Sequence, residues 1–434
     1  MQLSIEKLIY GGDGLARTAP DADGRSMAVF VPFVLPGEKV EADIRRQKAG
    51  FARGLVTQLV EASADRIAAL CPYFEKCGGC HYQHIPYAKQ LEFKSAILRE
   101  TLQRIAKVEL KSEVRLHGSP PWNYRNRTRL QLRTAPEFAL GYFRFGSHDF
   151  LSVGECPISS PLLNRVMTRL LDMRGSHCPA AVEELEFFAD APDEQVLAWA
   201  FCRSDADPKD LLRWAGELER DLPEISGVTF FSSRKGKHED DEPTNTKILA
   251  QAGAKTIRYR TKNHDYQVSA GSFFQINRHL IDELVSVVAA DARGELALEL
   301  YAGVGLFSVA LAPVFHHIFS VEASQTSYLD LLQNVPANVK AVGAQTEDYL
   351  KSRSLRTCPD LVVLDPPRSG IGKAVTSFLV ELKAPLVRYV SCDPSTLARD
   401  IAPLLAAGYH IEEAHLFDLF PETFHIESVM LLAL

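Results

Sequence analysis

Leu296-Ala297-Leu298-Glu299-Leu300-Tyr301-Ala302-Gly303-Val304-Gly305 is the stretch that decides the fold of the C-terminal third of this 434-residue chain. Its apolar first half predicts a buried strand, and its glycines predict a tight turn where a cofactor can approach the backbone. An apolar helix is expected over residues 306–312. The next strand, 317–321, ends at Glu322, a carboxylate suited to ribose hydroxyls. Residue 308 is Ser, so the full dinucleotide-binding fingerprint is missing.

Three short blocks near the C-terminus carry reactive side chains. Residues 364–370 read Leu-Asp-Pro-Pro-Arg-Ser-Gly, residues 390–394 read Val-Ser-Cys-Asp-Pro, and residues 424–429 read Phe-His-Ile-Glu-Ser-Val. A thiol at a strand end, an acid and an arginine at a Pro-Pro turn, and a late carboxylate suit methylation of a pyrimidine ring carbon. A thiolate that adds to carbon 6 makes carbon 5 nucleophilic, and a base must later remove the carbon-5 proton.

Together these blocks resemble the RNA 5-methyluridine methyltransferase family, which modifies transfer and ribosomal RNA. The resemblance implies that Cys392 is the nucleophile, that Glu427 removes the carbon-5 proton, and that Arg368 orients the ring carbonyl and stabilises the enolate. The glycine-rich stretch is similar to the class I fold of S-adenosylmethionine enzymes. Residues 271–277 resemble the family segment whose glutamine, here Gln275, faces both cofactor and substrate.

Several further cofactor contacts follow from the same resemblance. The residues expected to touch S-adenosylmethionine are Gln275, Tyr301, Gly303, Gly305, Glu322 and Asp365. Asp365 is placed to meet either the cofactor or the uracil. Leu306 stands where many members have Asn, a departure that bears on one cofactor hydrogen bond and leaves the fold prediction unchanged.

A cysteine loop lies between the N-terminal strands and the rest of the chain. Cys71, Cys77 and Cys80 fall within ten residues, and Cys156 is the candidate for a distant fourth ligand. Four thiolates suit zinc or an iron–sulfur cluster, and a triad with one remote cysteine favours the cluster. The family pattern, Cys-x5-Cys-x2-Cys with a distant Cys, implies a 4Fe–4S cluster on these four residues. The other cysteines show no partner pattern.

The N-terminal 60 residues read as short strands separated by glycine turns, with β-rich runs at 27–35, 40–44 and 55–60. This pattern predicts a small barrel of the OB type, a common oligonucleotide binder, and it resembles the RNA-binding TRAM domain. Residues 86–106 have the spacing of an amphipathic helix. Residues 122–130 interleave aromatic residues with arginines, which predicts a surface for single-stranded RNA.

Charge and composition are compatible with an RNA-modifying protein. The net charge is −7, yet residues 89–147 hold twelve Lys and Arg against five Asp and Glu, which predicts a basic stripe for phosphates. The N-terminus carries no apolar signal segment and no run of 18 apolar residues occurs, so a cytoplasmic protein outside the membrane is expected. A monomer is expected.

The predicted architecture is therefore α/β, with three parts. An OB-type barrel of the TRAM kind occupies 1–62, an α+β iron–sulfur and RNA-binding domain 63–82 and 117–262, and a Rossmann-like class I methyltransferase domain 83–116 and 263–434. The predicted function is transfer of a methyl group from S-adenosylmethionine to carbon 5 of a uridine in transfer or ribosomal RNA, through a covalent adduct of cysteine with carbon 6 of a flipped-out base.

Two alternatives stay open. RNA cytosine-5 methylation shares the thiol addition but favours a Pro-Cys motif, whereas Cys392 follows Ser391. An inactive RNA-binding or chaperone module is the other alternative, and a cofactor-binding assay separates it from an enzyme. The motifs do not identify which RNA or which uridine is the substrate.

Overall fold

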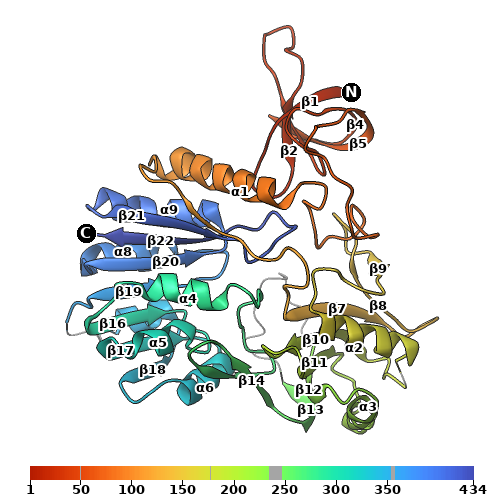
Figure 1. The fold of residues 1–434 in the computed structure, drawn as a ribbon, viewed down its shortest axis with the longest axis vertical. Coiled ribbons are helices and arrows are strands. Elements are labelled where there is room, and N and C mark those ends of the chain that lie inside the picture. Colours follow the sequence, from red (N-terminus) through yellow and green to blue (C-terminus); the bar gives the residue numbers. More distant parts are fainter. Residues whose placement is uncertain (49, 176, 234–246, 353–356) are drawn as a thin grey trace.

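The computed structural model describes residues 1–434 except 49, 176, 234–246 and 353–356, and it has three parts. A barrel lies at one end, a large mixed sheet with helices at the C-terminal side, and a second sheet beside it (Figure 1). The three parts are an N-terminal barrel, a central domain and a Rossmann-like domain.

The described N-terminal residues form a closed barrel in the strand order β1-β2-β3-β5-β4. Its strands are β1 (Gln2–Leu8), β2 (Gly14–Arg17), β3 (Ala28–Val31), β4 (Lys39–Lys48) and β5 (Phe51–Glu61). The closed five-stranded barrel agrees with the predicted OB type. Strand β3 is shorter than the predicted run 27–35, because Phe33 has a φ of 60° and the chain turns there. Val34 and Leu35 are nevertheless buried. The apolar residues at the end of this run therefore contribute to core packing and not to strand pairing.

The central domain is built on a seven-stranded sheet in the order β13-β12-β11-β10-β7-β8-β9. The strands are β7 (Arg127–Arg133), β8 (Ala139–Phe143), β9 (Phe150–Ser152), β10 (Val182–Ala189), β11 (Val196–Cys202), β12 (Ile225–Ser232) and β13 (Ile248–Gly253). One face packs on α2 (Pro161–Asp172) and α3 (Pro208–Asp221), and the other joins the core of the Rossmann-like domain. Strand β11 is buried at every residue because both faces are covered. A hairpin of β14 (Thr256–Arg260) and β15 (Asp265–Ser269) follows.

The Rossmann-like domain contains an eight-stranded sheet in the order β18-β17-β16-β19-β20-β22-β21-β6. Its strands are β6 (Arg115–His117), β16 (Gly294–Leu300), β17 (Phe315–Glu322), β18 (Val339–Gly343), β19 (Leu361–Leu364), β20 (Leu386–Ser391), β21 (His410–Phe417) and β22 (Glu427–Ala433). The strands from β18 to β20 are parallel, and β22 is antiparallel to both neighbours. The predicted strand–turn–helix–strand unit is therefore β16, the glycine turn, α5 (Leu306–Leu311) and β17.

Helices cover both faces of this sheet. One face holds α4 (Ile281–Ala289) and α5, and the other holds α8 (Gly372–Leu382) and α9 (Pro394–Ala406). Helices α6 (Gln325–Asn334) and α7 (Thr346–Lys351) lie beside β17. Helix α1 (Tyr87–Thr101), which continues as a π-helical turn to Ala106, packs against α9, and β6 pairs with β21 at the sheet edge. The described helices include none that is both long and apolar enough to cross a bilayer.

Candidate active site

The register of β20 and β22 brings the predicted nucleophile and base to the same place. Ser391 pairs with Ser428, so Cys392 and Glu427, the next residues outward, leave the antiparallel pair at the same end. Cys392 precedes α9, whose N-cap is Asp393: its Oδ1 accepts from the backbone N–H groups at 395 and 396, at 2.8 and 2.9 Å. The strand end and the capped helix together define the position of the thiol.

Four ionisable side chains, those of Glu427, Asp365, Arg368 and Asp393, lie close to Cys392. Burial raises the pKa of the Cys392 thiol well above its ordinary value, the carboxylates of Glu427 and Asp365 raise it further, and the Arg368 guanidinium lowers it. Glu427 is itself 5% exposed, and burial followed by Asp365 raises the pKa of its carboxyl. Burial raises the pKa of Asp365 to about 7. These groups are close enough to influence one another, as acid and base groups in active sites do.

Arg368 reaches the site from the turn after β19. Its side chain is exposed, and its Nη2 lies 3.5 Å from both ring nitrogens of His425. Burial, and then the positive charge of Arg368, lower the pKa of His425 below its usual value. Arg368 also lies close enough to Cys392 and Glu427 to lower the pKa of both groups.

The glycine turn after β16 forms the predicted cofactor edge. Gly303 has a φ of 55° with no atom within 4 Å of an added Cβ, so a ligand can approach its backbone. Its N–H donates to Glu322 Oε2 at 2.7 Å, and the N–H of Ser324 donates to Oε1 at 2.6 Å. Gly305, with a φ of 92°, begins α5, and an added Cβ there would lie 2.7 Å from Leu331. Tyr301 precedes this turn with a φ of 63°.

Gln275 connects the cofactor edge to the central domain. Its Nε2 lies 3.4 Å from Asp365 Oδ2, and its backbone carbonyl accepts from Asn126 Nδ2 at 3.0 Å. The same segment is held by Arg127, whose Nη1 donates to the carbonyl of Ser272 at 2.9 Å. Gln275 thus lies between Asp365, a predicted cofactor contact, and Asn126, which directly precedes β7 of the central sheet.

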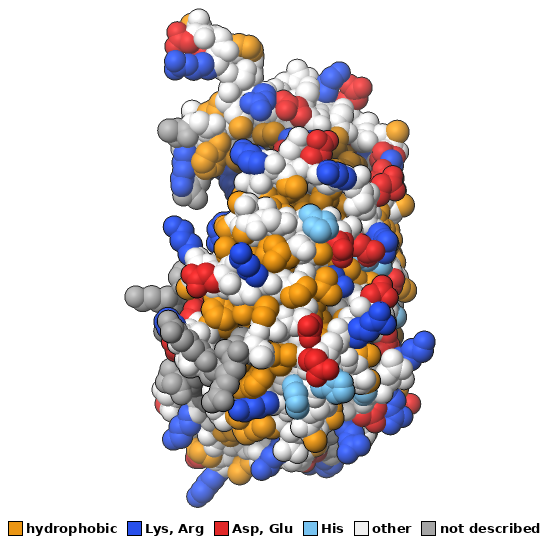
Figure 2. Space-filling model, turned by 90° about the vertical axis from the view of Figure 1, so that its left-hand side faces the viewer, with side chains coloured by type: hydrophobic (Ala, Val, Ile, Leu, Met, Phe, Trp, Pro, Cys, Tyr) orange, Lys and Arg blue, Asp and Glu red, His pale blue; other side chains and the backbone are white. Residues whose placement is uncertain are grey.

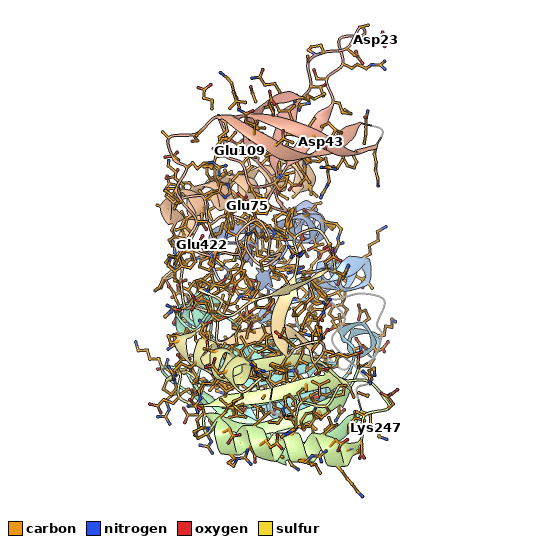
Figure 3. The ribbon with its side chains drawn as sticks, turned by 90° about the vertical axis from the view of Figure 1, so that its right-hand side faces the viewer. Asp23, Asp43, Glu75, Glu109, Lys247 and Glu422 are labelled. Carbon is orange, nitrogen blue, oxygen red and sulfur yellow. The ribbon has the colours of Figure 1, made fainter. Side chains whose placement is uncertain are left out.

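The segment that leads to Glu427 is held from several sides. Its first residue, Asp418, accepts from Lys94 Nζ at 2.7 Å, and both side chains are fully buried. The carbonyl of Glu422 accepts from the N–H groups of His81 and Tyr82 at 2.8 and 3.0 Å. Figure 3 labels Glu422 in the layer below the barrel, where the cysteine loop residue Glu75 also lies. Residues 418–426, named here the base loop, therefore join helix α1 and the cysteine loop to the site.

The four predicted cysteine ligands line one small cavity of about 70 Å³. The cavity walls also include Arg125, and its buried Nε has no hydrogen-bond partner among the described residues. Burial, with a smaller contribution from Cys156 and Cys71, raises the pKa of the Cys77 thiol to about 11. Within the part of the chain that the structure describes, no three His, Cys, Asp or Glu side chains meet the distances for holding a metal ion. All eight cysteines are free thiols.

The predicted RNA surface at residues 122–130 is wrong in one respect. Tyr124 is fully buried and its hydroxyl donates to the carbonyl of Pro421 at 3.1 Å, so its ring is not available to stack on a base. Arg127 and Arg129 pair with Glu186 and Glu184 and lie over aromatic rings of β11. Figure 2 shows one face of the molecule, on which basic side chains are interspersed with acidic and hydrophobic ones.

Two contributions to the site have weak sequence signals. Tyr10 of the barrel donates from its hydroxyl to the carbonyl of Cys392 at 3.2 Å, across 382 residues, and nothing local indicates it. Lys94 has a signal, because it is a charged residue on the face of the 86–106 helix that carries Leu91 and Leu98.

The parallel sheet, the glycine turn with its terminal carboxylate, and the reactive residues at the strand ends define a class I methyltransferase. A family profile described as tRNA (Uracil-5-)-methyltransferase matches residues 86–434. The chain belongs to this family. The prediction of an S-adenosylmethionine-dependent RNA (uracil-5-)-methyltransferase is thus confirmed at the level of the family.

Individual relatives agree. A 23S rRNA (uracil(1939)-C(5))-methyltransferase of Halomonas elongata is 32% identical over 99% of this chain and 89% of its own length. An uncharacterized RNA methyltransferase of Aquifex aeolicus is 31% identical over 100% of this chain and 98% of its own. The crystal structure of the Pyrococcus abyssi tRNA (uracil-54, C5)-methyltransferase, in complex with S-adenosyl-L-homocysteine, has a TM-score of 0.76 at 25% identity and covers both chains fully.

Proposed function

We propose that this protein methylates carbon 5 of a uridine in transfer or ribosomal RNA by covalent catalysis from Cys392. The observation that carries the proposal is the juxtaposition of Cys392 and Glu427 at the end of the β20–β22 pair, beside Arg368 and Asp365. We further propose that the barrel is an RNA-binding TRAM domain and that the enzyme acts as a cytoplasmic monomer on a flipped-out base.

The methyl donor, S-adenosylmethionine, supplies an electrophilic methyl group at the edge that Tyr301, Gly303, Gly305 and Glu322 form. Glu322 is suited to accept hydrogen bonds from ribose hydroxyls, because its carboxylate already accepts from the backbone at this edge. Gln275 and Asp365 complete the pocket on the side that faces the base.

Cys392 begins the reaction as a protonated thiol, because burial and then the surrounding carboxyl groups raise its pKa. The Asp365 carboxylate, whose pKa burial raises to about 7, accepts the thiol proton as the sulfur attacks. Its sulfur forms a bond to carbon 6 of the uracil, and the electron pair moves to the ring carbonyl as an enolate that Arg368 stabilises. Carbon 5 then forms its bond to the methyl group. Glu427 removes the remaining carbon-5 proton, the carbon 5–carbon 6 double bond forms again, and the Cys392 sulfur leaves as a thiolate that takes back the proton held by Asp365.

Two variants test this assignment with RNA that contains 5-fluorouridine, in which fluorine cannot leave as a proton. The parent protein is expected to form a covalent adduct that resists denaturant, and Cys392→Ala to form none while still binding S-adenosylmethionine. Cys358→Ala is the matched control, since Cys358 is exposed and precedes β19, whose other end leads to Asp365. Methylation at the normal rate by Cys392→Ala would overturn the proposal.

Glu427→Gln separates the two halves of the reaction. The variant is expected to add its thiol and transfer the methyl group, then accumulate a methylated RNA–protein adduct on ordinary uridine RNA. Release of fully methylated RNA at the parent rate would show that another group removes the proton. Mapping 5-methyluridine in the transfer and ribosomal RNA of a strain that lacks the gene identifies the substrate.

The four cysteines are proposed to hold a 4Fe–4S cluster. Cys71, Cys77, Cys80 and Cys156 line a common cavity, and thiolates around a cluster carry negative charge. The unpartnered Nε of Arg125 at that cavity fits an anionic group. When bound, the cluster would cross-link the cysteine loop to the segment that contains Cys156. Because Cys80 directly precedes His81 and Tyr82, which hold the base loop, the cluster would support the site from outside the reaction.

A further inference from the structure

The N-terminal barrel contributes a side chain to the active site. Tyr10, in the turn between β1 and β2, donates a hydrogen bond from its hydroxyl to the backbone carbonyl of Cys392 at 3.2 Å. Its ring lies edge-on against Phe424 of the base loop, with 5.7 Å between the ring centroids. One residue therefore touches both the nucleophile's backbone and the loop that leads to Glu427.

The barrel is held firmly enough for this contact to matter. Leu8 and Leu35 are buried in the same hydrophobic cluster as the residues of α8 and α9, and Tyr10 packs against that cluster. Lys7 forms an ion pair with Glu100 of α1 at 2.6 Å. Contacts of this kind fix the β1–β2 turn relative to the methyltransferase sheet.

Gly12 brings the same turn against the base loop. A Cβ added at Gly12 would lie 3.3 Å from atoms of both His81 and Phe424, whereas a Cβ at Gly11 would meet no atom within 4 Å. Both glycines have a positive φ, which is 105° at Gly11 and 91° at Gly12. Only the backbone of Gly12 therefore approaches the site closely enough to be sensitive to added volume.

We propose that Tyr10 is a positioning residue for the nucleophile: its hydroxyl holds the Cys392 carbonyl so that the thiol is directed at carbon 6 of the uracil. The inference rests on the proposed thiol-addition mechanism. Without this hydrogen bond, the backbone of Cys392, between the end of β20 and the N-cap of α9, is free to move. The attacking sulfur is then less well aligned with carbon 6. Tyr10 donates as a neutral phenol, because burial and then the nearby Asp393 and Cys392 raise its pKa.

Tyr10→Phe removes the hydroxyl and keeps the ring against Phe424. Tyr409→Phe is the matched control, because the Tyr409 hydroxyl also donates to a backbone carbonyl, that of Ala384 at 2.7 Å, away from the reactive residues. We expect Tyr10→Phe to lower kcat and the rate of adduct formation with 5-fluorouridine RNA by roughly fivefold, the effect of losing one hydrogen bond. In Tyr10→Phe, KM for RNA and for S-adenosylmethionine should stay unchanged. In Tyr409→Phe, kcat and the rate of adduct formation should each fall by less than twofold.

Alkylation of Cys392 by iodoacetamide, followed by mass spectrometry without RNA, gives an independent readout. A freer thiol should react at least twofold faster in Tyr10→Phe, although adduct formation is slower, and a purely structural defect would not produce these opposite changes. Gly12→Ala should show the same pair of effects more strongly than Gly11→Ala. Equal alkylation and adduct rates in Tyr10→Phe and the parent would overturn the inference. Absence of any adduct in the parent would instead overturn the thiol mechanism, and alkylation would still test the contact.

Discussion

The buried ion pair between Lys94 and Asp418 offers a sharp test of how the base loop is held. Both side chains are fully buried at a separation of 2.7 Å, and Lys94 Nζ also donates to the carbonyl of Phe420 at 3.1 Å. Lys94→Met keeps most of the volume but leaves the Asp418 carboxylate without its cation in a site closed to water. Breaking a buried pair in this way costs about 3–5 kcal/mol.

Helix α1 provides its own control. Lys89 pairs with Glu92 at the same separation, 2.7 Å, but their side chains are 38% and 58% exposed. An exposed helical pair of this kind contributes about 0.3–0.5 kcal/mol. The loss of unfolding free energy in Lys89→Met should therefore be roughly one tenth of the loss in Lys94→Met, although the two variants make the same chemical change on the same helix.

Urea unfolding followed by circular dichroism measures the difference. For an m value of about 3 kcal/mol/M, the transition that includes α1 should move by about 1 to 1.7 M in Lys94→Met and by about 0.1 to 0.2 M in Lys89→Met. A double variant, Lys94→Met with Asp418→Leu, should recover part of the loss, because it leaves no unpaired charge. Equal shifts in the two single variants would refute this account of the base loop.

Two further predictions concern buried ionisable groups. Burial raises the pKa of Glu299 to about 8, so the folded chain keeps this carboxyl protonated and should lose a few kcal/mol of stability as pH rises from about 4.5 to 8. Glu299→Gln should flatten that dependence in thermal unfolding, and a parent-like pH dependence in the variant would contradict the assignment. Cys156→Ser in anaerobically purified protein should lose most of the roughly four irons that a 4Fe–4S cluster contains, and RNA affinity should fall more than S-adenosylmethionine affinity. Cys178→Ser, the matched control, should keep its iron; stoichiometric zinc without iron in the parent would exclude the cluster.

The sequence predicted the parts of the site that local patterns encode. Cys392 and Asp365 each follow an apolar strand, and the strand–turn signal places both at the carboxyl edge of a parallel sheet. The glycine turn before α5 could be predicted from the sequence for the same reason. These features depend on a few consecutive residues, so one chain segment suffices to predict them.

Contacts between distant segments could not be predicted in this way. Lys94 and Asp418 are 324 residues apart, and Tyr10 and Cys392 are 382 apart. A buried Lys on an apolar helix face indicates that some anion must be near, but it does not identify which one. Similarly, the arginines after Trp122 were interpreted as RNA ligands, whereas cross-strand pairing with Glu186 and Glu184 depends on a strand register that begins 55 residues later.

The carboxyl groups around Cys392 bear on how the proposed base, Glu427, is kept ready for its late step. Glu427 and Asp365 lie close together, and burial raises the pKa of both. A sulfonium donor bound at the glycine turn after β16 carries a positive charge, which favours the ionised form of nearby carboxyl groups. This charge disappears when the methyl group is transferred. Glu427 should therefore be ionised while S-adenosylmethionine is bound and should gain proton affinity when the carbon-5 proton must leave. Infrared difference spectra of the protein with S-adenosylmethionine and with S-adenosylhomocysteine, each compared with Glu427→Gln, measure this protonation directly. An identical carboxyl signal with both ligands would refute the idea that the reaction itself strengthens the base.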